Sequence, residues 1–374
     1  MKEQTIIIND TNIARCENNP LLTPDMVKPS CEGFIVKGVF NCGVAKYKEE
    51  YILLCRVAEA VKSDSEDVVK FPVIVNEDGK SCFKTITLIK SENSELCFDD
   101  SRTITRGKDG NSNVVYLTTL SHLRIARSKD GVHFTIDEQP TIMPNEENEC
   151  WGMEDPRITR IDDTYYINYT AVSPYGAETA LITTKDFGNF TREGCIFLPE
   201  NKDVTIFPEK INGKYYAFNR PVPKAIGTPD IWLSESNDLI HWGKHQHFYG
   251  VSDTGWENGR IGGGAPPIKT EKGWIKIYHA ADRNSRYCLG VFLLDLENPD
   301  KILAKSEKPL LEPEEYYEKN GFFGEVVFTC GCLYEDNKVI IYYGAADDTI
   351  CRADISLEEL YSHLGVGEQS QSTV

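Results

Sequence analysis

Long apolar segments are absent from this sequence of 374 residues, and so is the pattern of a signal peptide. Nowhere do about eighteen apolar residues run together, as an ordinary transmembrane helix requires. The first 15 residues lack the basic region followed by an apolar region that a secretory leader carries. We therefore expect a protein that is neither exported nor bound to a membrane and that works in the cytoplasm.

Metal-binding cysteine motifs are also missing, although the chain has 12 cysteines. No CxxC pair occurs, and Cys330 and Cys332 have no second pair of ligands at zinc-finger spacing. Cys55 and Cys288 lie inside apolar, strand-like runs. Diluted over 42.2 kDa, the cysteines fit free buried thiols better than a disulfide scaffold. The sequence predicts no metal site.

Positive charge is in short supply, because 58 acidic residues outnumber 40 basic ones and the net charge is −18. Such a surface repels nucleic acids and anionic membranes, so neither is an expected partner. An anionic ligand would need a local cluster of basic side chains.

Strand patterns dominate what is present, and helical periodicity is confined to residues 356–364. Runs rich in Tyr, Ile, Val and Phe recur after polar turns. Five of them align without gaps: 50-EYILLCR-56, 164-TYYINYT-170, 214-KYYAFNR-220, 273-GWIKIYH-279 and 338-KVIIYYG-344. The prediction is an all-β chain whose sheets repeat.

A second repeat supports this reading and suggests the number of sheets. Residues 128-SKDGVHF-134, 184-TKDFGNF-190 and 236-SNDLIHW-242 keep a small polar residue, an Asp and an aromatic at one spacing. The strand repeats are mostly one four-stranded blade apart, apart from a polar excursion that includes residues 62–67 and 106–113. We predict a five-bladed β-propeller with a short C-terminal helix, forming a single domain over residues 1–374. A β-sandwich would not explain two motifs at blade-length intervals.

The aligned strands end in a column of residues with functional potential. In a propeller, equivalent positions of inner strands converge on the central channel. The column reads Arg56, Thr170, Arg220, His279 and Gly344, with Lys202 and Lys269 nearby. Arg and Lys are the usual donors to phosphate, and the glycine run before Lys269 could bring backbone amides close to a ligand. The alternative is that these cations form structural ion pairs with neighbouring carboxylates.

A second cluster of charge lies in 152-GMEDPRI-158, just before a strand. Pro156 favours extended backbone, so Glu154 and Asp155 would point into a cavity with Arg157 beside them. A salt bridge that closes a turn is the competing explanation. Aromatic side chains of the kind that pack on sugar rings, or in a core, occur at Trp151, Tyr175, Trp232, Trp256 and Tyr278. Carbohydrate chemistry is the consistent interpretation.

These motifs resemble those of the glycoside hydrolase family 130 phosphorylases, five-bladed propellers that cleave β-mannosides with inorganic phosphate. The resemblance covers most of the chain. Matching stretches, in order, are 39-VFNCGV-44, 53-LLCRVAE-59, 152-GMEDPRI-158, 201-NKDVTIFPEKINGKY-215, 219-NRP-221, 230-DIWLS-234, 260-RIGGGAPPIKT-270, 277-IYH-279 and 342-YYGAAD-347.

The resemblance implies a role for each matching residue. Asp155 would be the proton donor, acting through the 3-hydroxyl of the bound mannose. Asn41 and Arg157 would hold the transferred mannose, and Asp347 would contact the acceptor sugar. The phosphate site would comprise Arg56, Lys202, Arg220, Lys269 and His279, with Tyr278 beside them. Phosphate would be a co-substrate, no cofactor would be needed, and the products would be α-mannose 1-phosphate and a shortened sugar.

The acceptor remains open at this point. The favoured substrate is β-1,2-mannobiose or its oligomers; β-1,4-mannooligosaccharides and mannosylglucose are alternatives. Cys42, Asn219 and residues 324–331 depart from the usual family pattern. Glu325 is the carboxylate that keeps a hydrolase of the same fold in view, and a carbohydrate-binding propeller without activity is a further alternative. Many relatives form dimers or larger assemblies, and residues 356–364 could contribute to a homo-oligomer.

Overall fold

The computed structural model describes residues 13–63, 65–107, 113–145 and 147–367. The prediction of an all-β chain is confirmed. Most of the N-terminal segment read for a signal peptide, and the centre of the polar stretch 106–113, lie outside the described residues. No helix in the described part is long and apolar enough to cross a membrane.

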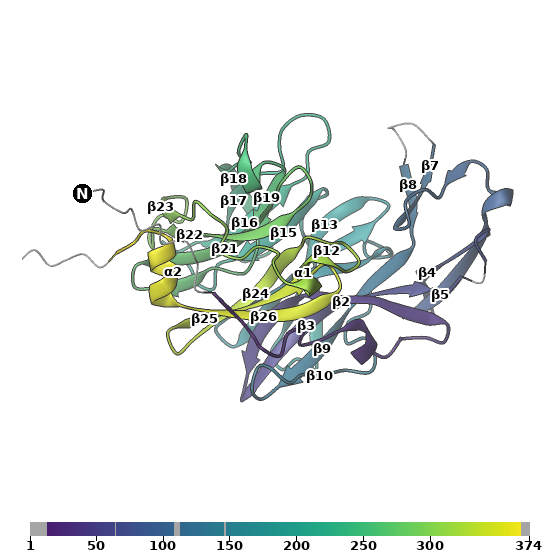
Figure 1. Cartoon of the computed structure of the whole chain (residues 1–374), viewed down its shortest axis with the longest axis horizontal. Helices are drawn as coiled ribbons and strands as arrows, with labels where there is room; N and C mark the ends of the chain where they lie inside the picture. Colours follow the sequence, from purple (N-terminus) through teal and green to yellow (C-terminus); the bar gives the residue numbers. More distant parts are fainter. Residues whose placement is uncertain (1–12, 64, 108–112, 146, 368–374) are drawn as a thin grey trace, which may run out of the picture.

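Five antiparallel sheets of four or five strands make up most of the molecule (Figure 1). The first contains, in spatial order, β2 (Phe34–Tyr47), β3 (Glu50–Val61), β9 (Thr119–Ser128) and β10 (Thr135–Ile136). The second contains β11 (Gly152–Ile161), β12 (Thr164–Ser173), β13 (Gly176–Thr184) and β14 (Phe190–Phe197). The third contains β15 (Asn201–Ile206), β16 (Tyr215–Pro221), β17 (Ile231–Ser236) and β18 (Trp242–Tyr249).

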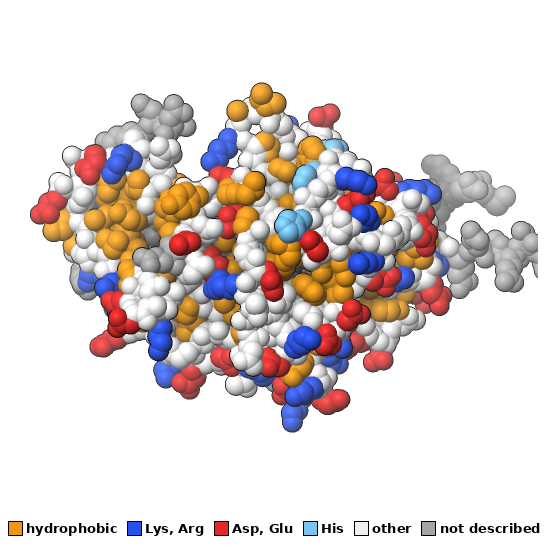
Figure 2. All heavy atoms as spheres, turned by 180° about the vertical axis from the view of Figure 1, so that it is seen from behind, with side chains coloured by type: hydrophobic (Ala, Val, Ile, Leu, Met, Phe, Trp, Pro, Cys, Tyr) orange, Lys and Arg blue, Asp and Glu red, His pale blue; other side chains and the backbone are white. Residues whose placement is uncertain are grey.

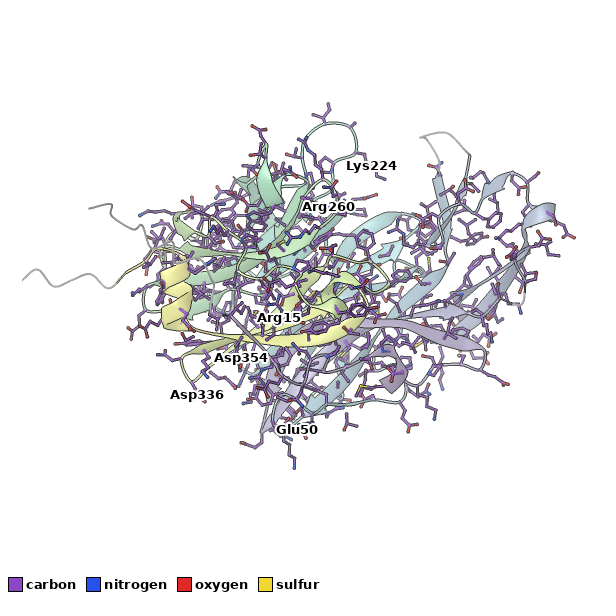
Figure 3. The ribbon with its side chains drawn as sticks, in the orientation of Figure 1. Arg15, Glu50, Lys224, Arg260, Asp336 and Asp354 are labelled. Atoms are coloured by element: carbon purple, nitrogen blue, oxygen red, sulfur yellow. The ribbon has the colours of Figure 1, made fainter. Side chains whose placement is uncertain are left out.

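The fourth and fifth large sheets come next along the chain and are also given in spatial order. The fourth contains β19 (Arg260–Gly263) and β20 (Ile268–Thr270), both paired with β21 (Gly273–Ala281), then β22 (Tyr287–Leu294) and β23 (Ile302–Lys305). The fifth contains β24 (Val327–Glu335), β25 (Lys338–Ala345), β26 (Thr349–Ser356) and β1 (Ala14–Arg15). Its outer strand therefore comes from the N-terminal part of the chain. Figure 3 labels Arg15 and Asp354, which lie on these two neighbouring strands.

The polar excursion after β3 forms a separate arm, defined here as residues 62–118. It holds two small sheets: β4 (Val68–Glu77) with β5 (Lys80–Ile89), and β6 (Leu96–Cys97), β7 (Thr103–Arg106) and β8 (Asn113–Leu117). Phe71, Leu96 and Ile104 form its own small core. Figure 1 shows the arm at the end of the molecule opposite α2 (Leu357–His363).

Helical structure is short and confined to connections and to the C-terminal segment. The remaining helical elements are α1 (Tyr316–Lys319) and the 3-10 turns η1 (Pro24–Met26), η2 (Lys90–Glu92) and η3 (Gly255–Glu257). The predicted C-terminal helix is present as α2. Ser356 and Glu359 cap its start reciprocally, each side chain accepting the other's backbone N–H.

The five aligned sequence segments fall on β3, β12, β16, β21 and β25, each the second strand of a different large sheet. β21 is buried throughout, and the other four strands are buried over most of their length. Because both faces of such a strand are covered, it reads as a nearly continuous apolar run rather than an alternating one. The repeat found in the sequence therefore marks one equivalent strand in each sheet.

The second sequence repeat forms the turn between the third and fourth strands. Ser128 Oγ accepts the backbone N–H of Asp130 and Gly131, and Asp130 Oδ1 accepts those of Val132 and His133. The same bonds recur at residues 184–189 and 236–241. Ser, Thr and Asp are favoured here because their side chains satisfy turn amides. This motif is structural.

Apolar side chains pack between successive large sheets. Separate buried clusters join the first sheet to the second, the second to the third, the third to the fourth and the fourth to the fifth. A further cluster, which includes Val39, Leu53, Tyr342 and Ile350, joins the fifth sheet to the first. Each large sheet is thus covered on both faces. Figure 2 shows acidic and basic side chains mixed over one face of the molecule rather than separated by sign.

Candidate active site

Three first strands carry a bulge at the same relative place. The ladder shifts register between Phe40 and Gly43 in β2, and equivalent shifts occur in β11 and β15. Each bulge contains one residue with left-handed backbone: Asn41 (φ 47°), Asp155 (φ 50°) and Asp203 (φ 57°). A bulge of this kind re-aims a side chain, and left-handed backbone at a residue other than glycine is a strain that often marks a functional site.

The Asp155 carboxylate lies where the first two sheets meet. Asn41 Nδ2 donates to Asp155 Oδ1 over 2.9 Å, and Arg56 Nη1 donates to the same oxygen over 3.0 Å. Within the described chain, Oδ2 accepts no hydrogen bond, and 11% of the side chain is exposed. One oxygen is therefore held in place while the other is left for a ligand.

Asn41 also explains the glycine at the end of the repeat column. A Cβ atom added at Gly344 would lie 2.2 Å from Asn41 Oδ1. Only glycine leaves room for Asn41 at this crossing of β2 and β25.

Glu154 occupies the other side of Arg56. It accepts hydrogen bonds from Arg56 Nη2 over 2.8 Å and from Lys202 Nζ over 3.1 Å. Burial opposes ionisation of this carboxyl, but Arg56 and Lys202 outweigh it and lower the pKa of Glu154 to about 2. Glu154 is thus an ionised carboxylate that keeps two cations in place. Arg56 is supported further by Ser121 Oγ and by the Phe40 ring beneath it.

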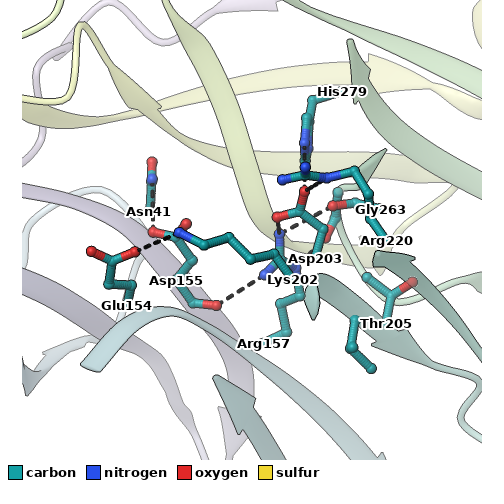
Figure 4. A network of polar contacts seen from close by, with 12 residues as sticks. Asn41, Glu154, Asp155, Arg157, Lys202, Asp203, Thr205, Arg220, Gly263 and His279 are labelled. Atoms are coloured by element: carbon teal, nitrogen blue, oxygen red, sulfur yellow. Dashed lines mark hydrogen bonds and ion pairs between the residues drawn. The ribbon is translucent and has the colours of Figure 1, made fainter. Parts of the chain in front are cut away.

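Asp203 is the centre of a second network (Figure 4). It accepts from Arg220 Nε over 2.6 Å and from Arg157 Nη2 over 3.2 Å, and His279 Nε2 lies 3.1 Å away. Burial opposes its ionisation, yet these cationic partners hold its pKa well below the usual range. In the described chain Arg220 donates only through Nε, which leaves both terminal nitrogens for a ligand.

Arg157 is a buried link between the two networks rather than an exposed ligand. Only 1% of the residue is exposed, and it donates to the carbonyls of Asp155, Gly263 and Gly264 as well as to Asp203. The glycine run was expected to offer amides to a ligand. Its carbonyls accept from Arg157, which fixes the bulge that carries Asp155, and the approach of its amides to a ligand stays a prediction.

Asp347 lies at the rim of the same site, in the turn between β25 and β26. Burial raises the pKa of this carboxyl to about 7, and the nearby charges of Asp155 and Glu154 act in the same direction against Arg56. Asp347 also has left-handed backbone, with φ 50°. It is positioned to face whatever occupies the space beside Asp155.

Most of the predicted cations converge. Arg56, Lys202, Arg220 and His279 come from three sheets and lie within the two linked networks, as the column of repeat ends predicted. The alternative reading was also correct in part, because each of these side chains contacts a carboxylate in this structure. Cations and acids are arranged together rather than as a purely basic pocket.

Lys269 is not brought to this cluster. It pairs with Glu209, its side chain is 50% exposed, and its register partner on β21 is Trp274. Trp274 lies five positions before His279, which is about 16 Å along a strand. Proximity in the glycine-rich segment was misleading because β20 runs away from the site.

Tyr278 is also placed elsewhere. Neighbouring residues on a strand point to opposite faces, so Tyr278 faces away from His279. Its ring stacks between Trp256 and Phe292, and its hydroxyl donates to Glu257. Tyr278 is a core residue of the interface between the third and fourth sheets.

Sequence reasoning missed Asp203 and Tyr287. The signal for Asp203 was available, since Asn41 and Asp155 each lie nine residues before an aligned strand and Asp203 lies eleven before the next. Tyr287 accepts a hydrogen bond from Arg260 Nη1 over 3.1 Å, and its ring is 6.1 Å from that of His279. No local motif marks it. Glu325, by contrast, is 48% exposed and lies 3.6 Å from Arg286.

The arrangement places one acid, whose second oxygen accepts no hydrogen bond within the described chain, beside several basic side chains. Such a site can hold an anion next to a bond while the acid delivers a proton to it. In the described chain no group of three or more His, Cys, Asp and Glu side chains is placed to hold a metal ion.

Comparison with known proteins agrees with this chemistry. The family model for glycoside hydrolase family 130, described as β-1,4-mannooligosaccharide phosphorylase, matches residues 114–364. A β-1,2-mannobiose phosphorylase from Listeria innocua is 49% identical over 355 residues, which covers 95% of this chain and 99% of the relative. A 1,2-β-oligomannan phosphorylase from a Thermoanaerobacter species is 40% identical over 69% of this chain and 86% of its own length.

A solved structure gives the same result. The Listeria innocua β-1,2-mannobiose phosphorylase in complex with β-1,2-mannobiose superposes with a TM-score of 0.89 at 48% identity. The match covers 95% of this chain and 100% of that chain. On the sequence motifs, the fold and these similarities together, the chain belongs to glycoside hydrolase family 130.

Proposed function

We propose that the chain catalyses inverting phosphorolysis of short β-mannosides, with β-1,2-mannobiose as the first choice of substrate. Inorganic phosphate would attack the anomeric carbon, and the products would be α-mannose 1-phosphate and mannose. The observation that carries the proposal is that Oδ2 of Asp155 accepts no hydrogen bond within the described chain and lies beside the networks that hold Arg56, Lys202, Arg220 and His279.

Phosphate would bind on the donors that the carboxylates leave available. Arg220 offers two terminal nitrogens, and Lys202 has donors beyond its one bond to Glu154. Because phosphate is already an anion, the enzyme needs no general base to activate it. Its task is to hold the phosphate in line with the anomeric carbon and to exclude water. Tyr287, whose ring lies 6.1 Å from that of His279, would stand beside the phosphate site in place of Tyr278, which the family resemblance implied.

Asp155 would supply the proton as the glycosidic bond breaks, either directly to the leaving oxygen or through the 3-hydroxyl of the mannose. In this structure Arg56 Nη1 donates to Asp155 Oδ1, the oxygen that Asn41 also contacts. A phosphate that draws Arg56 toward itself would weaken that contact. Asn41 would keep the carboxyl oriented, Arg157 would fix its bulge from behind, and Asp347 would face the acceptor sugar.

The linkage is proposed from similarity rather than from the geometry of the site. The relative with 49% identity acts, by its name, on β-1,2-mannobiose, whereas the family model's description names β-1,4-mannooligosaccharides. Identity over nearly the whole of both chains is the stronger guide, so β-1,4-linked substrates and mannosylglucose stand second. Hydrolysis is disfavoured because the cationic set is present and Glu325 is paired with Arg286.

A product assay tests the proposal. The protein is incubated with β-1,2-mannobiose, β-1,4-mannobiose and mannosylglucose, each with and without phosphate. We expect α-mannose 1-phosphate only when phosphate is present, and fastest from β-1,2-mannobiose. Equal release of mannose with and without phosphate would identify a hydrolase, and sugar binding without turnover would identify a binding protein.

We also propose that the five large sheets are the blades of one propeller that forms a single domain. The support is the set of apolar clusters between successive sheets, including the one that joins the fifth sheet to the first. The reaction needs phosphate as co-substrate and no cofactor. A phosphorolytic cleavage conserves the energy of the glycosidic bond in a sugar phosphate that the cell can use directly, so we propose that the protein works in the cytoplasm. We also propose that it forms a homo-oligomer.

A further inference from the structure

The arm enters and leaves the first sheet at the end that holds the candidate active site. β3 carries Arg56 and runs on to Val61, where the arm begins. The arm returns into β9, whose Ser121 accepts a hydrogen bond from Arg56. The arm thus leaves from the strand that carries Arg56 and returns into the strand that contacts it, so the arm is well placed to form part of the wall of the site.

Within the arm, Arg102 is held in one orientation. Asp100 Oδ1 accepts the backbone N–H of Arg102 over 2.8 Å and its Nε over 3.1 Å, and Asp100 Oδ2 accepts Nη2 over 2.9 Å. Thr118, beside β9, donates its N–H to the carbonyl of Arg102 and its hydroxyl to the carbonyl of Ser101. The turn is therefore fixed to the root of the arm, although half of the Arg102 side chain is exposed.

The Arg102 guanidinium reaches a segment from the far end of the sequence. Its central carbon lies 5.8 Å from the centre of the Phe323 ring. The backbone N–H of Phe323 donates over 2.9 Å to the carbonyl of Ala346, the residue before Asp347. Arg102 is also close enough to Asp347 to act electrostatically on that carboxyl. One wall thus combines the arm, residues 320–326 and the turn that carries Asp347.

We propose that Arg102 is a specificity-determining residue for the leaving sugar, with Phe323 and Asp347 as its partners in that wall. The proposal rests on the phosphorolysis proposed above and extends it to the acceptor side. In the described chain Nη1 of Arg102 makes no hydrogen bond, so it can donate to sugar hydroxyls. The Phe323 ring offers the apolar face against which the C–H surface of a sugar packs. In the proposed function phosphate would bind at the network around Asp203, with which Arg102 makes no hydrogen bond or ion pair in the described chain, so its binding should not depend on Arg102.

The experiment compares two substitutions with a control in the same arm. Arg102→Ala removes the donor, and Arg102→Lys keeps charge but loses the planar fork. Lys84→Ala is the control, because Lys84 forms an exposed ion pair with Glu77 on the β4–β5 hairpin. Steady-state kinetics are measured in both directions: phosphorolysis of β-1,2-mannobiose, and synthesis from α-mannose 1-phosphate with mannose as acceptor.

For Arg102→Ala we expect the KM for the acceptor to rise on the order of tenfold or more, as the loss of a charge-assisted hydrogen bond predicts. The KM for phosphate should stay within about twofold of wild type, Arg102→Lys should be intermediate, and Lys84→Ala should match wild type. An unchanged acceptor KM, or equal changes in the KM for acceptor and for phosphate, would overturn the proposal.

Two further outcomes are distinguishable. If Arg102→Ala is poorly folded, Phe323→Leu tests the same wall, and an unchanged acceptor KM in that variant would also overturn the proposal. If the wild-type protein forms no sugar phosphate from any mannoside, the phosphorolysis proposal fails and this one fails with it. If wild type is active while the variants match it, only the role of Arg102 is lost.

Discussion

Asp155 and Asp203 occupy equivalent positions in neighbouring sheets but have opposite surroundings. Both lie on bulges of a first strand, and both have left-handed backbone. Asp203 is contacted by Arg157, Arg220 and His279 through both of its oxygens. Among the residues that the structure describes, the side chain of Asp155 has hydrogen-bond partners on one oxygen only.

This difference in hydrogen-bond partners shows that the same bulged strand can support two different roles for an aspartate. A buried carboxylate that is paired with two arginines and contacted by His279 organises charge and cannot readily exchange a proton. A carboxylate with one oxygen left for a ligand can do so. The bulge sets the direction of the Asp side chain, and the hydrogen-bond partners of the carboxylate determine whether it has a structural or a catalytic role.

Matched substitutions give the sharpest test of this contrast, and Asp155→Asn carries the largest expected effect. The amide keeps the size of the side chain but has no proton to donate, so kcat should fall by about 10²–10⁴-fold. The thermal midpoint should change little. Turnover near the wild-type rate would remove Asp155 from the role of proton donor.

Asp203→Asn should lower the stability of the protein more than Asp155→Asn does. Removing the charge leaves Arg157 and Arg220 buried without their counter-ion, which costs about 3–5 kcal/mol of folding free energy. Calorimetry should show a midpoint lower by several degrees. A variant as stable as wild type but inactive would mean that Asp203, too, acts mainly in the chemistry.

Gly344→Ala tests whether Asn41 positions Asp155. The new methyl group would overlap Asn41 Oδ1, and overpacking of this kind costs about 1–3 kcal/mol. We expect kcat to fall while the KM for phosphate stays near wild type, because the phosphate ligands are untouched. Loss of stability with full kcat would show that Asn41 supports the fold rather than the acid.

Asp347→Asn is expected to change the pH dependence of stability. The folded-state pKa of Asp347 is raised to about 7, above its ordinary value of 3.8. The folded protein therefore binds more protons than the unfolded chain between about pH 4 and pH 7, and stability falls as the pH rises through that window. The variant lacks this loss.

Denaturant unfolding at pH 5 and pH 8 measures the effect. The variant should gain relative to wild type at pH 8, at about 1.4 kcal/mol for each unit by which the wild-type pKa is raised. The same difference between the two proteins at both pH values would contradict a raised pKa.

The repeats in the sequence were enough to predict an all-β chain and the position of one strand in each large sheet. They succeeded because the second strand is buried on both faces and keeps one apolar pattern. The convergence of Arg56, Arg220 and His279 followed from that alignment. Asp155 stood out through the charge packed around Pro156.

The remaining parts depended on contacts that sequence distance does not reveal. Lys269 follows a glycine run that packs against Arg157, yet β20 carries the lysine away from the site. Tyr278 and His279 are neighbours in sequence but face opposite sides of a strand. Arg102 and Phe323 are brought together only by the fold of the arm.

The pairing of β1 with β26 has a consequence for how the protein is made. During synthesis on a ribosome, β1 emerges first but cannot find its hydrogen-bonding partner until the final strand has been translated. The last sheet must therefore wait for completion while the other four assemble in order. A nascent chain stalled before Thr349 would expose the unpaired edge of β25, a site for aggregation. Once β26 has been made it covers that edge, and β1 then covers the edge of β26.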